Sequence, residues 1–448
     1  MLRRLIHTMN VDLLVFFLSL VNSIVINRAL GPALLGQYIL VTTAAILLSK
    51  LVSLGIESSV STLAAKDRSL AGSLYMQSVL SALILGGGAV SAFFLAYGYV
   101  AGSLLKDIRS ELILPALLTV PLLLHSSYWS SLMAGLEEIT LLNRYKLVSS
   151  LSMLLIAYLV LMVFKSGLVQ LLYLSLAFNS LLALLAGCIV FRRYRGSGVA
   201  LRRGIFQEAL SLGVKAHLGN IAHFVFHRVD YFLINYLIGS QAVGFYGLAT
   251  SLAESIWMTI GSLYTVTLAR IAGSPLRESV DLVAKILRNV VFLLCVVAAA
   301  LMLCGYGLIK ILYGAAFLPA YVPMILLLPG VIFFGASWFL GLFFIGHQKR
   351  PGVTTAIAWA GLALSLPLYV LLIKFVGISG AAIASSATYL FIFLATFLLF
   401  RKVSGKSLSE VLFIRKADIG EVYVGLRRMV FPAATSEEGG VAGDERII

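Results

Sequence analysis

Long apolar stretches separated by short polar joins run along most of the chain. A helix that crosses the hydrocarbon core of a bilayer needs about 20 mostly apolar residues. Glycine and proline mark several of the joins, as at Gly31-Pro32 and Pro351-Gly352. The pattern predicts twelve membrane-spanning helices, over residues 11–29, 36–56, 73–97, 112–133, 146–164, 168–191, 209–238, 243–269, 286–308, 322–345, 353–375 and 378–400.

The composition agrees with a chain that lies mostly in lipid. Of the 448 residues, 60% are hydrophobic and 12% are charged, and the mean hydropathy is +1.00. Soluble domains have about 45–50% apolar and about 25% charged residues. The sequence therefore predicts an all-α integral membrane protein. Cys188, Cys295 and Cys304 lie inside apolar stretches, so we expect no disulfide framework, no metal site and no cofactor.

The 34 lysines and arginines give a net charge of +15, but their positions indicate membrane topology rather than nucleic-acid binding. One side of the predicted membrane, which includes both termini, holds 25 of them, and the loops of the other side hold six. Cytoplasmic loops carry the excess of positive charge. We therefore expect a multi-pass protein of the plasma (inner) membrane with both termini in the cytoplasm. Residues 406–448 are expected to form a loosely ordered cytoplasmic tail.

Two segments of the chain repeat one another. Residues 27–38 (NRALGPALLGQY) match residues 235–246 (NYLIGSQAVGFY), with Asn, two Gly and Tyr recurring at an offset of 208. The repeat predicts two pseudo-symmetric lobes of six spans each, over residues 1–200 and 201–405. Because six is even, both lobes cross the membrane in the same sense, and a substrate site is expected in a central cavity between them.

The seventh predicted span carries several polar side chains on one helical face. One arc holds His217, Asn220, His223, His227 and Asp230, with Arg228 at its edge. A charge at the bilayer centre costs at least about 2.5–3.5 kcal/mol, so such groups face protein or water. We interpret this face as the lining of a water-filled cavity. The alternative, that these groups only pair and join helices, stays open.

The first predicted span carries a matching polar face. The repeat relates Asp12 to Asn220, Ser19 to His227 and Asn22 to Asp230. Two such faces on either side of an axis are what a cavity between two lobes requires.

Spans 2 and 8 add further charged groups. Lys50 and Glu57 share one face of span 2, because they are seven residues apart. In span 8, Glu254 is placed to pair with Arg228 across the two helices. Whether that pair is structural or functional stays open at this point.

Sequence signatures of soluble enzymes are absent. The chain has no GxxxxGK[ST] phosphate-binding loop and no HExxH, CxxC or GxSxG motif. The predicted loops are also too short to hold a catalytic domain. We therefore expect a protein that is not an enzyme and that is driven by an ion gradient, by the membrane potential or by downstream use of its product.

Several segments resemble those of known flippases. Asn27–Glu57 and Arg228–Ala249 are similar in order and spacing to polysaccharide-biosynthesis flippases, and so are Leu312–Tyr321 and Gly377–Ala382. These proteins form the polysaccharide transporter (O-antigen flippase-like) branch of the multidrug/oligosaccharidyl-lipid/polysaccharide (MOP) exporter superfamily. The resemblance covers about residues 1–405.

The resemblance implies two six-helix lobes around a central cavity that opens alternately to each side. It implies a lipid-linked oligosaccharide as substrate, usually on a polyprenyl diphosphate, whose headgroup moves from the cytoplasmic to the outer leaflet. Family members bind the diphosphate through cationic cavity residues. Here the candidates are Arg228 and Lys50, with His223 and His227 as auxiliaries.

Proton or Na⁺ coupling is expected to involve acidic groups, and the candidates are Asp12, Asp230, Glu254 and Glu57. Asn22 and Asn220 are expected as further polar lining of the cavity. Membrane lipid and glycan-assembly proteins are the expected partners. Two alternatives stay open: a cation-coupled multidrug exporter of the same superfamily, and a non-transporting membrane scaffold for glycan assembly. The exporter would favour carboxylates and aromatics in its cavity, whereas the scaffold would pack spans 1 and 7 tightly.

Overall fold

The computed structural model describes residues 2–102, 105, 108–194, 203–415 and 418, and all regular structure in them is helical. The first part of the chain forms α1 (Leu2–Val52), α2 (Ile56–Lys66), α3 (Ala71–Leu95), α4 (Tyr97–Gly102), α5 (Ile113–Gly135), α6 (Ile139–Tyr158) and α7 (Leu168–Arg193). The second part forms α8 (Arg203–Leu237), α9 (Ser240–Glu254), α10 (Met258–Gly273), α11 (Leu276–Leu312), α12 (Tyr321–Leu342), α13 (Pro351–Val376), α14 (Ile378–Ser404) and α15 (Leu408–Leu412).

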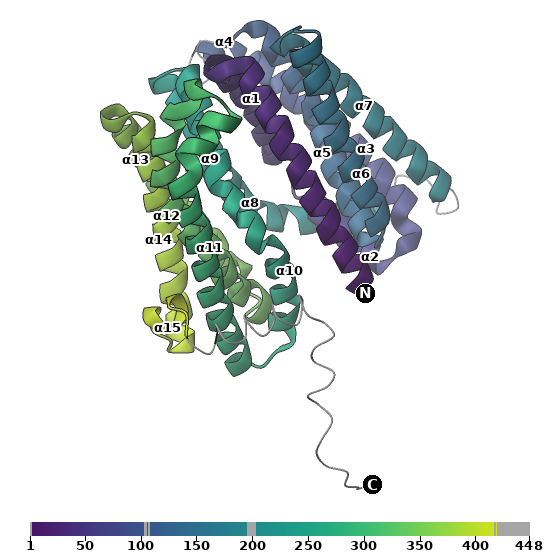
Figure 1. Cartoon of the computed structure of the whole chain (residues 1–448). Coiled ribbons are helices and arrows are strands. Elements are labelled where there is room, and N and C mark those ends of the chain that lie inside the picture. The colour runs from purple at the N-terminus through teal and green to yellow at the C-terminus, as the bar shows by residue number, and fades with distance from the viewer. Residues whose placement is uncertain (1, 103–104, 106–107, 195–202, 416–417, 419–448) are drawn as a thin grey trace, which may run out of the picture.

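Within the described residues, nine helices are long and apolar enough to cross a membrane. One of these, Thr8–Val52, contains two helical segments, because the backbone leaves helical geometry at Gly31. Helix α2, which follows this stretch, lies at the same end of the molecule as the N-terminus (Figure 1), so the two segments run in opposite directions. The chain is therefore a multi-pass, all-helical membrane protein.

The two repeated segments use a glycine at the same position. Gly31 has a φ of +65° and Gly239 has a φ of +126°, values that L residues with a side chain rarely adopt. Each glycine lies between two helical segments, so the repeated motif lets the chain reverse direction at both places.

Helices α1–α7 lie on one side of the molecule and α8–α15 on the other (Figure 1). The second segment of α1 packs against α9 through glycines on both helices. A Cβ at Gly36 would overlap the carbonyl oxygen of Ser240, and a Cβ at Gly244 would overlap the carbonyl oxygen of Pro32. Because the offset of 208 relates these two contacts, each is the counterpart of the other.

A second contact joins the two parts closer to the end that holds the N-terminus. The backbone of Gly55 lies very close to that of Gly213 on α8. A Cβ at either glycine would overlap backbone atoms at the other. Nε2 of His217 lies 3.0 Å from the carbonyl oxygen of Leu51. Thus α8 is held against the region where α1 ends and α2 begins.

Two predicted spans contain breaks that the hydrophobic pattern did not indicate. The helix of predicted span 2 ends at Val52, and after Leu54 and Gly55, which both have positive φ, α2 continues to Lys66. Predicted span 8 is divided by one 3-10 turn, Ser255–Trp257, between α9 and α10. Polar residues lie at both breaks, Ser53 and Glu57 at the first and Glu254 and Ser255 at the second. Single polar residues also occur inside unbroken helices, so hydropathy alone does not reveal a break.

The expectation of a loosely ordered tail from residue 406 is wrong for the part of the tail that the structure describes. Ser407 and Glu410 form a capping box that starts α15. Asp418 receives two hydrogen bonds from Arg288 of α11, at 2.6 Å from Nε and 2.9 Å from Nη2. This ion pair is buried, with side chains 8% and 5% exposed, so the start of the tail is docked on α11.

Candidate functional site

Arg228 on α8 and Glu254 at the end of α9 form a two-bond ion pair, which confirms the predicted pairing. Nη1 donates to Oε1 at 3.0 Å and Nη2 donates to Oε2 at 2.8 Å. Arg228 lies about nine residues, or about 14 Å, before the end of α8, and its side chain is 34% exposed. A charge at that depth faces protein or water rather than lipid, because exposure to hydrocarbon is costly.

Lys50 reaches the same helix from the other part of the molecule. Its Nζ lies 5.2 Å from the ring centroid of Phe224, which is a cation–π geometry. Phe224 and Arg228 are four residues apart on α8 and therefore share a face. Among the described residues, no carboxylate lies within ion-pairing distance of Lys50, whereas Arg228 is neutralised by Glu254. The structure thus brings the two predicted cations to one face of α8.

His223 and His227 lie next to the ion pair, with ring centroids 4.6 Å apart. Nδ1 of His227 is 3.2 Å from the hydroxyl of Tyr389 on α14 and 3.9 Å from Oε1 of Glu254. The ring of Phe334 on α12 lies 5.6 Å from that of His223 and 4.9 Å from that of His227. Both histidines are therefore surrounded by aromatic side chains of the second part of the chain.

Asp230 lies in a separate polar group and is 3% exposed. One of its oxygens accepts from the backbone N–H of Tyr231 at 2.9 Å, and Tyr246 hydrogen-bonds to the side chain. Ser385 of α14 shares hydrogen bonds with Tyr246 and Tyr369, at 2.9 and 3.0 Å. The structure therefore places Asp230 among tyrosines inside the second part of the chain.

The structure describes the surroundings of two polar residues predicted on span 1, Asp12 and Asn22. Asp12 pairs with Lys146 of α6 at 2.9 Å, and both side chains are largely exposed. Oδ1 of Asn22 is buried and has no hydrogen-bond partner among the described residues. The side chain of Asn220 lies outside the described part of the structure. Asp12 therefore contacts a helix of its own half.

Glu57 belongs to a polar group inside the first part of the chain. Ser53 donates to its Oε1 at 3.3 Å, and the hydroxyl of Tyr128 donates to the carbonyl oxygen of Ser53 at 3.0 Å. Oε2 of Glu57 is buried without a hydrogen-bond partner among the described residues. Glu57 thus lies on α2 among groups that α5 supplies.

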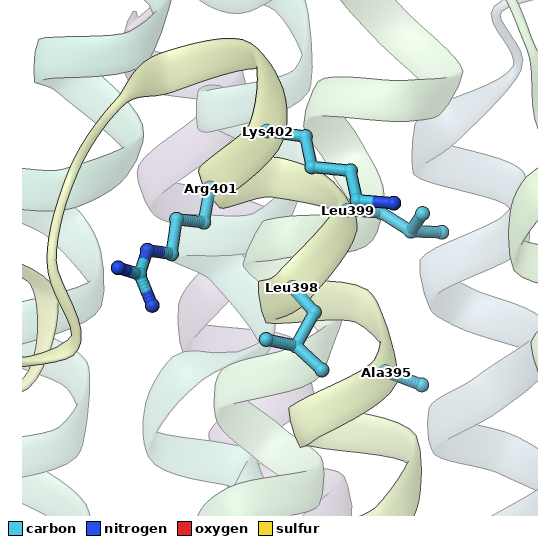
Figure 2. A pocket seen from close by; sticks show the side chains of 5 residues that line it. All are labelled: Ala395, Leu398, Leu399, Arg401 and Lys402. Atoms are coloured by element: carbon cyan, nitrogen blue, oxygen red, sulfur yellow. The ribbon is translucent and has the colours of Figure 1, made fainter.

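A surface groove lies at the end of α14 and is lined by Ala395, Leu398, Leu399, Arg401 and Lys402. Figure 2 shows Arg401 pointing to one side of the helix and Lys402 to the other. The two cations do not converge on a common point. Basic residues at the end of a spanning helix are typical of the membrane–water interface, so the groove is not a candidate substrate site.

Sequence comparison identifies the family. Residues 1–274 match the model of a family described as polysaccharide biosynthesis protein. The chain belongs to this family. No curated protein matches the chain.

Solved structures of the MOP superfamily share the fold. The lipid II flippase MurJ in an inward closed conformation has a TM-score of 0.74 at 14% identity, over 95% of this chain and 99% of that chain. An inward-facing multidrug resistance MATE family transporter has a TM-score of 0.72 at 14% identity, over 87% and 94%. A MOP superfamily transporter from Pyrococcus furiosus has a TM-score of 0.64 at 13% identity, over 90% and 96%.

These likenesses show a MOP transporter fold. Together with the polysaccharide biosynthesis family, they confirm the predicted resemblance. The fold is that of solved transporters, as the sequence predicted.

Sequence reasoning did not find the aromatic residues around the histidines. Phe334, Trp338 and Tyr389 lie in predicted spans 10 and 12, where apolar and aromatic residues are abundant. Nothing in the periodicity distinguishes an aromatic side chain that packs on a histidine from one that faces lipid. Only Trp257 could be related to the charged groups from the sequence, since it lies three residues after Glu254 on the same helical face.

Proposed function

We propose that the chain is a flippase that moves the headgroup of a lipid-linked oligosaccharide from the cytoplasmic to the outer leaflet by alternating access, in surface polysaccharide biosynthesis. The observation that carries the proposal is the position of Lys50. It is a cation without a carboxylate partner among the described residues, held over Phe224 one helical turn from Arg228. A polyprenyl diphosphate presents charged oxygens that fixed cations bind strongly in a water-poor environment.

The proposed organisation has twelve spans in two lobes, residues 1–200 and 201–405, around a central cavity. In addition to the single-span helices, α1 would supply two spans, and α8 and the α9–α10 pair one each. Both termini, and the tail over residues 406–448, would lie in the cytoplasm. The position of the N-terminus and α15 at the same end of the molecule supports this topology (Figure 1).

The proposed cycle uses the contact between the two parts of the chain. The headgroup would enter from the cytoplasmic end while the Gly36–Gly244 contact keeps the other end closed. Binding of the diphosphate between Lys50 and Arg228 would then favour separation at that contact. The oligosaccharide needs a wet path, because many unpaired hydroxyls in hydrocarbon would be costly.

The prenyl chain would stay in lipid throughout the cycle. Two helices that meet neither of the glycine contacts offer apolar faces for it, the first segment of α1 and α10. Leu13 and Phe17 are 55% and 54% exposed, and Met258 and Val266 are each 46% exposed. We therefore infer that the prenyl chain passes between α1 and α10.

Among the four candidate coupling carboxylates, Glu254 is the best placed. It holds Arg228 directly, so a proton on Glu254 would release the guanidinium to the diphosphate. Among the described residues, Asp230, Glu57 and Asp12 form no ion pair with Lys50 or Arg228.

A multidrug exporter is the second candidate function. The aromatic rings near His227 and the neutralisation of Arg228 by Glu254 favour it, since organic cations bind aromatic and carboxylate surfaces. Lys50 opposes it, because an unpaired lysine repels a cationic drug.

Ligand-induced stabilisation of the purified protein separates the two functions. A ligand that binds only the native state raises the unfolding temperature. If the protein is a flippase, a prenyl diphosphate disaccharide should raise the unfolding temperature and ethidium should change it little. The effect of the prenyl diphosphate disaccharide should be lost in Lys50→Ala and kept in Lys50→Arg. Stabilisation by ethidium alone would contradict the flippase function and support the multidrug exporter.

A further inference from the structure

Three partly exposed aromatic side chains form a row that begins at Trp257, three residues after Glu254, and takes no part in the Arg228–Glu254 ion pair. The ring centroids of Trp257 and Trp338 are 5.1 Å apart, and those of Trp338 and Tyr264 are 6.4 Å apart. All three side chains are half-buried. We call Trp257, Trp338 and Tyr264 the aromatic platform.

The platform rests on a buried aromatic layer. Phe334 and Tyr389 are 2% and 4% exposed and stack at 4.7 Å between centroids. Phe334 lies 5.5 Å from Trp257 and 6.0 Å from Trp338. The buried layer therefore supports one side of the platform and leaves its other side partly open.

Trp257 is held in position before any ligand binds. Its Nε1 donates to the carbonyl oxygen of Val331 at 2.9 Å. A Cβ at Gly335 would lie 3.1 Å from the indole, so only a glycine there accommodates the ring without displacement. An indole fixed in this way loses little further freedom on binding a ligand.

The platform is next to the charged groups. Trp257 follows Glu254 by three residues, and its ring lies 5.9 Å from that of His227. In a lipid-linked oligosaccharide the first sugar is bonded directly to the diphosphate. A diphosphate between Lys50 and Arg228 would therefore carry its first sugar to the neighbourhood of Trp257.

We propose that Trp257 and Trp338 bind the first sugar ring of the substrate by stacking against its C–H face, and so select glycosylated over unglycosylated prenyl diphosphate. The inference rests on the proposed function. The electron-rich face of an aromatic ring attracts the partly positive hydrogens of a pyranose ring, as it does the edge of another aromatic ring. The sugar hydroxyls then point outward, toward water and polar groups.

A sugar fits the surroundings better than a planar organic cation does. Glu254 is paired with Arg228 through two hydrogen bonds, so the pair carries no net charge. Lys50, which lies over the same face of α8, adds a positive charge. A neutral ring that carries an anionic group matches this arrangement.

The test compares two ligands on the full-length protein: a prenyl diphosphate disaccharide and the same prenyl diphosphate without sugar. For Trp338→Leu we expect about three- to tenfold weaker binding of the glycosylated ligand and unchanged binding of the other, since aromatic contacts are worth about 0.5–1.5 kcal/mol. Trp338→Phe keeps a ring and should retain most of the affinity. Lys50→Ala should weaken both ligands.

Trp359→Leu is the matched control, because Trp359 is 43% exposed on α13 and outside the platform. Equal losses for both ligands in Trp338→Leu, or no loss for either, would overturn the sugar platform. Ethidium is measured as a third ligand. If Trp338→Leu weakens the binding of ethidium alone, the aromatic platform binds drugs and not a sugar. If wild-type protein binds neither prenyl diphosphate, the proposed function fails instead, so the two failures are distinguishable. Trp338→Phe keeps the test valid if the leucine variant does not fold.

Discussion

At the residue scale, the two cations at one face of α8 differ in how they are paired. Arg228 and Lys50 both reach one face of the helix, but Glu254 occupies two N–H groups of Arg228. A carboxylate and a diphosphate compete for the same guanidinium geometry. Under the proposed function, Lys50 would therefore bind the anion first, and Arg228 would become available only when Glu254 is protonated or displaced.

The substitution Glu254→Gln tests this competition. Removing the carboxylate charge should free Arg228 and tighten binding of prenyl diphosphate by about tenfold, since hydrogen bonds to charged groups are worth about 1.5–3 kcal/mol. Equilibrium binding to purified protein measures the change. Glu57→Gln is the control, because Glu57 does not contact Arg228, and it should leave the affinity unchanged. Weaker binding in a folded Glu254→Gln variant would show that Glu254 helps to hold the ligand.

At the element scale, the two parts of the chain meet through glycines at two places, and the tail docks on α11. Helical pairs that pack through glycine bring backbones into direct contact. A side chain added there cannot move aside by changing its rotamer, because it meets the main chain of the neighbour. Such contacts are therefore sensitive to a single methyl group.

Gly244→Ala should separate α9 from the second segment of α1. The added methyl group would overlap the carbonyl oxygen of Pro32, so the helices must move apart. We expect severalfold faster maleimide labelling of a cysteine at the buried position Leu35, in a variant without the native cysteines. Gly88→Ala adds the same methyl group where nothing lies within 4 Å and should not change the labelling. Equal labelling rates in Gly244→Ala and Gly88→Ala would show that the Gly36–Gly244 contact does not close this end of the molecule.

The docked tail should detach in acid. The hydrogen bond from Arg288 holds the pKa of Asp418 below its ordinary value. The stabilisation is therefore complete above the ordinary carboxyl pKa of about 4 and is lost as the pH falls through the lower, native value. The mobility of a spin label at Ser409 should rise below about pH 4.

Asp418→Asn should raise the same mobility at neutral pH, because a buried pair that loses one partner costs about 3–5 kcal/mol. Asp281→Asn is the matched control. It breaks the exposed Lys406–Asp281 pair between the same elements and should have little effect. If both variants behave alike, the buried pair does not fix the tail.

Sequence reasoning and structure differ for physical reasons. The hydrophobic pattern predicted the helices because bilayer thickness sets their length. The Arg228–Glu254 pair was predictable because both charges lie in adjacent spans, where an unpaired charge is expensive. The break at Gly55 and the rings of Phe334 and Tyr389 were not, since neither changes the apolar pattern. The docking of Asp418 depends on a distant arginine in α11.

At the scale of the whole molecule, alternating access requires two parts of the chain that separate alternately at two contacts. Gly36 and Gly244 close one end, and Gly55 with Gly213 holds α8 near the other. Lys50 lies over Phe224, on the face of α8 that also carries Arg228. A headgroup bound to both cations would therefore span the interface of the two parts. This arrangement links substrate binding to relative movement of the halves.

The proposed function requires that the protein carry a lipid-linked oligosaccharide headgroup across the membrane. The most direct measurement is the rate at which a labelled prenyl diphosphate oligosaccharide becomes accessible to a glycan-binding lectin on the far side of proteoliposomes. We predict a rate well above that of protein-free liposomes, a loss of about tenfold or more in Lys50→Ala, as expected for one charge-assisted hydrogen bond, and substantial activity in Lys50→Arg. A wild-type rate equal to that of protein-free liposomes, with the ion gradient present, would contradict the account.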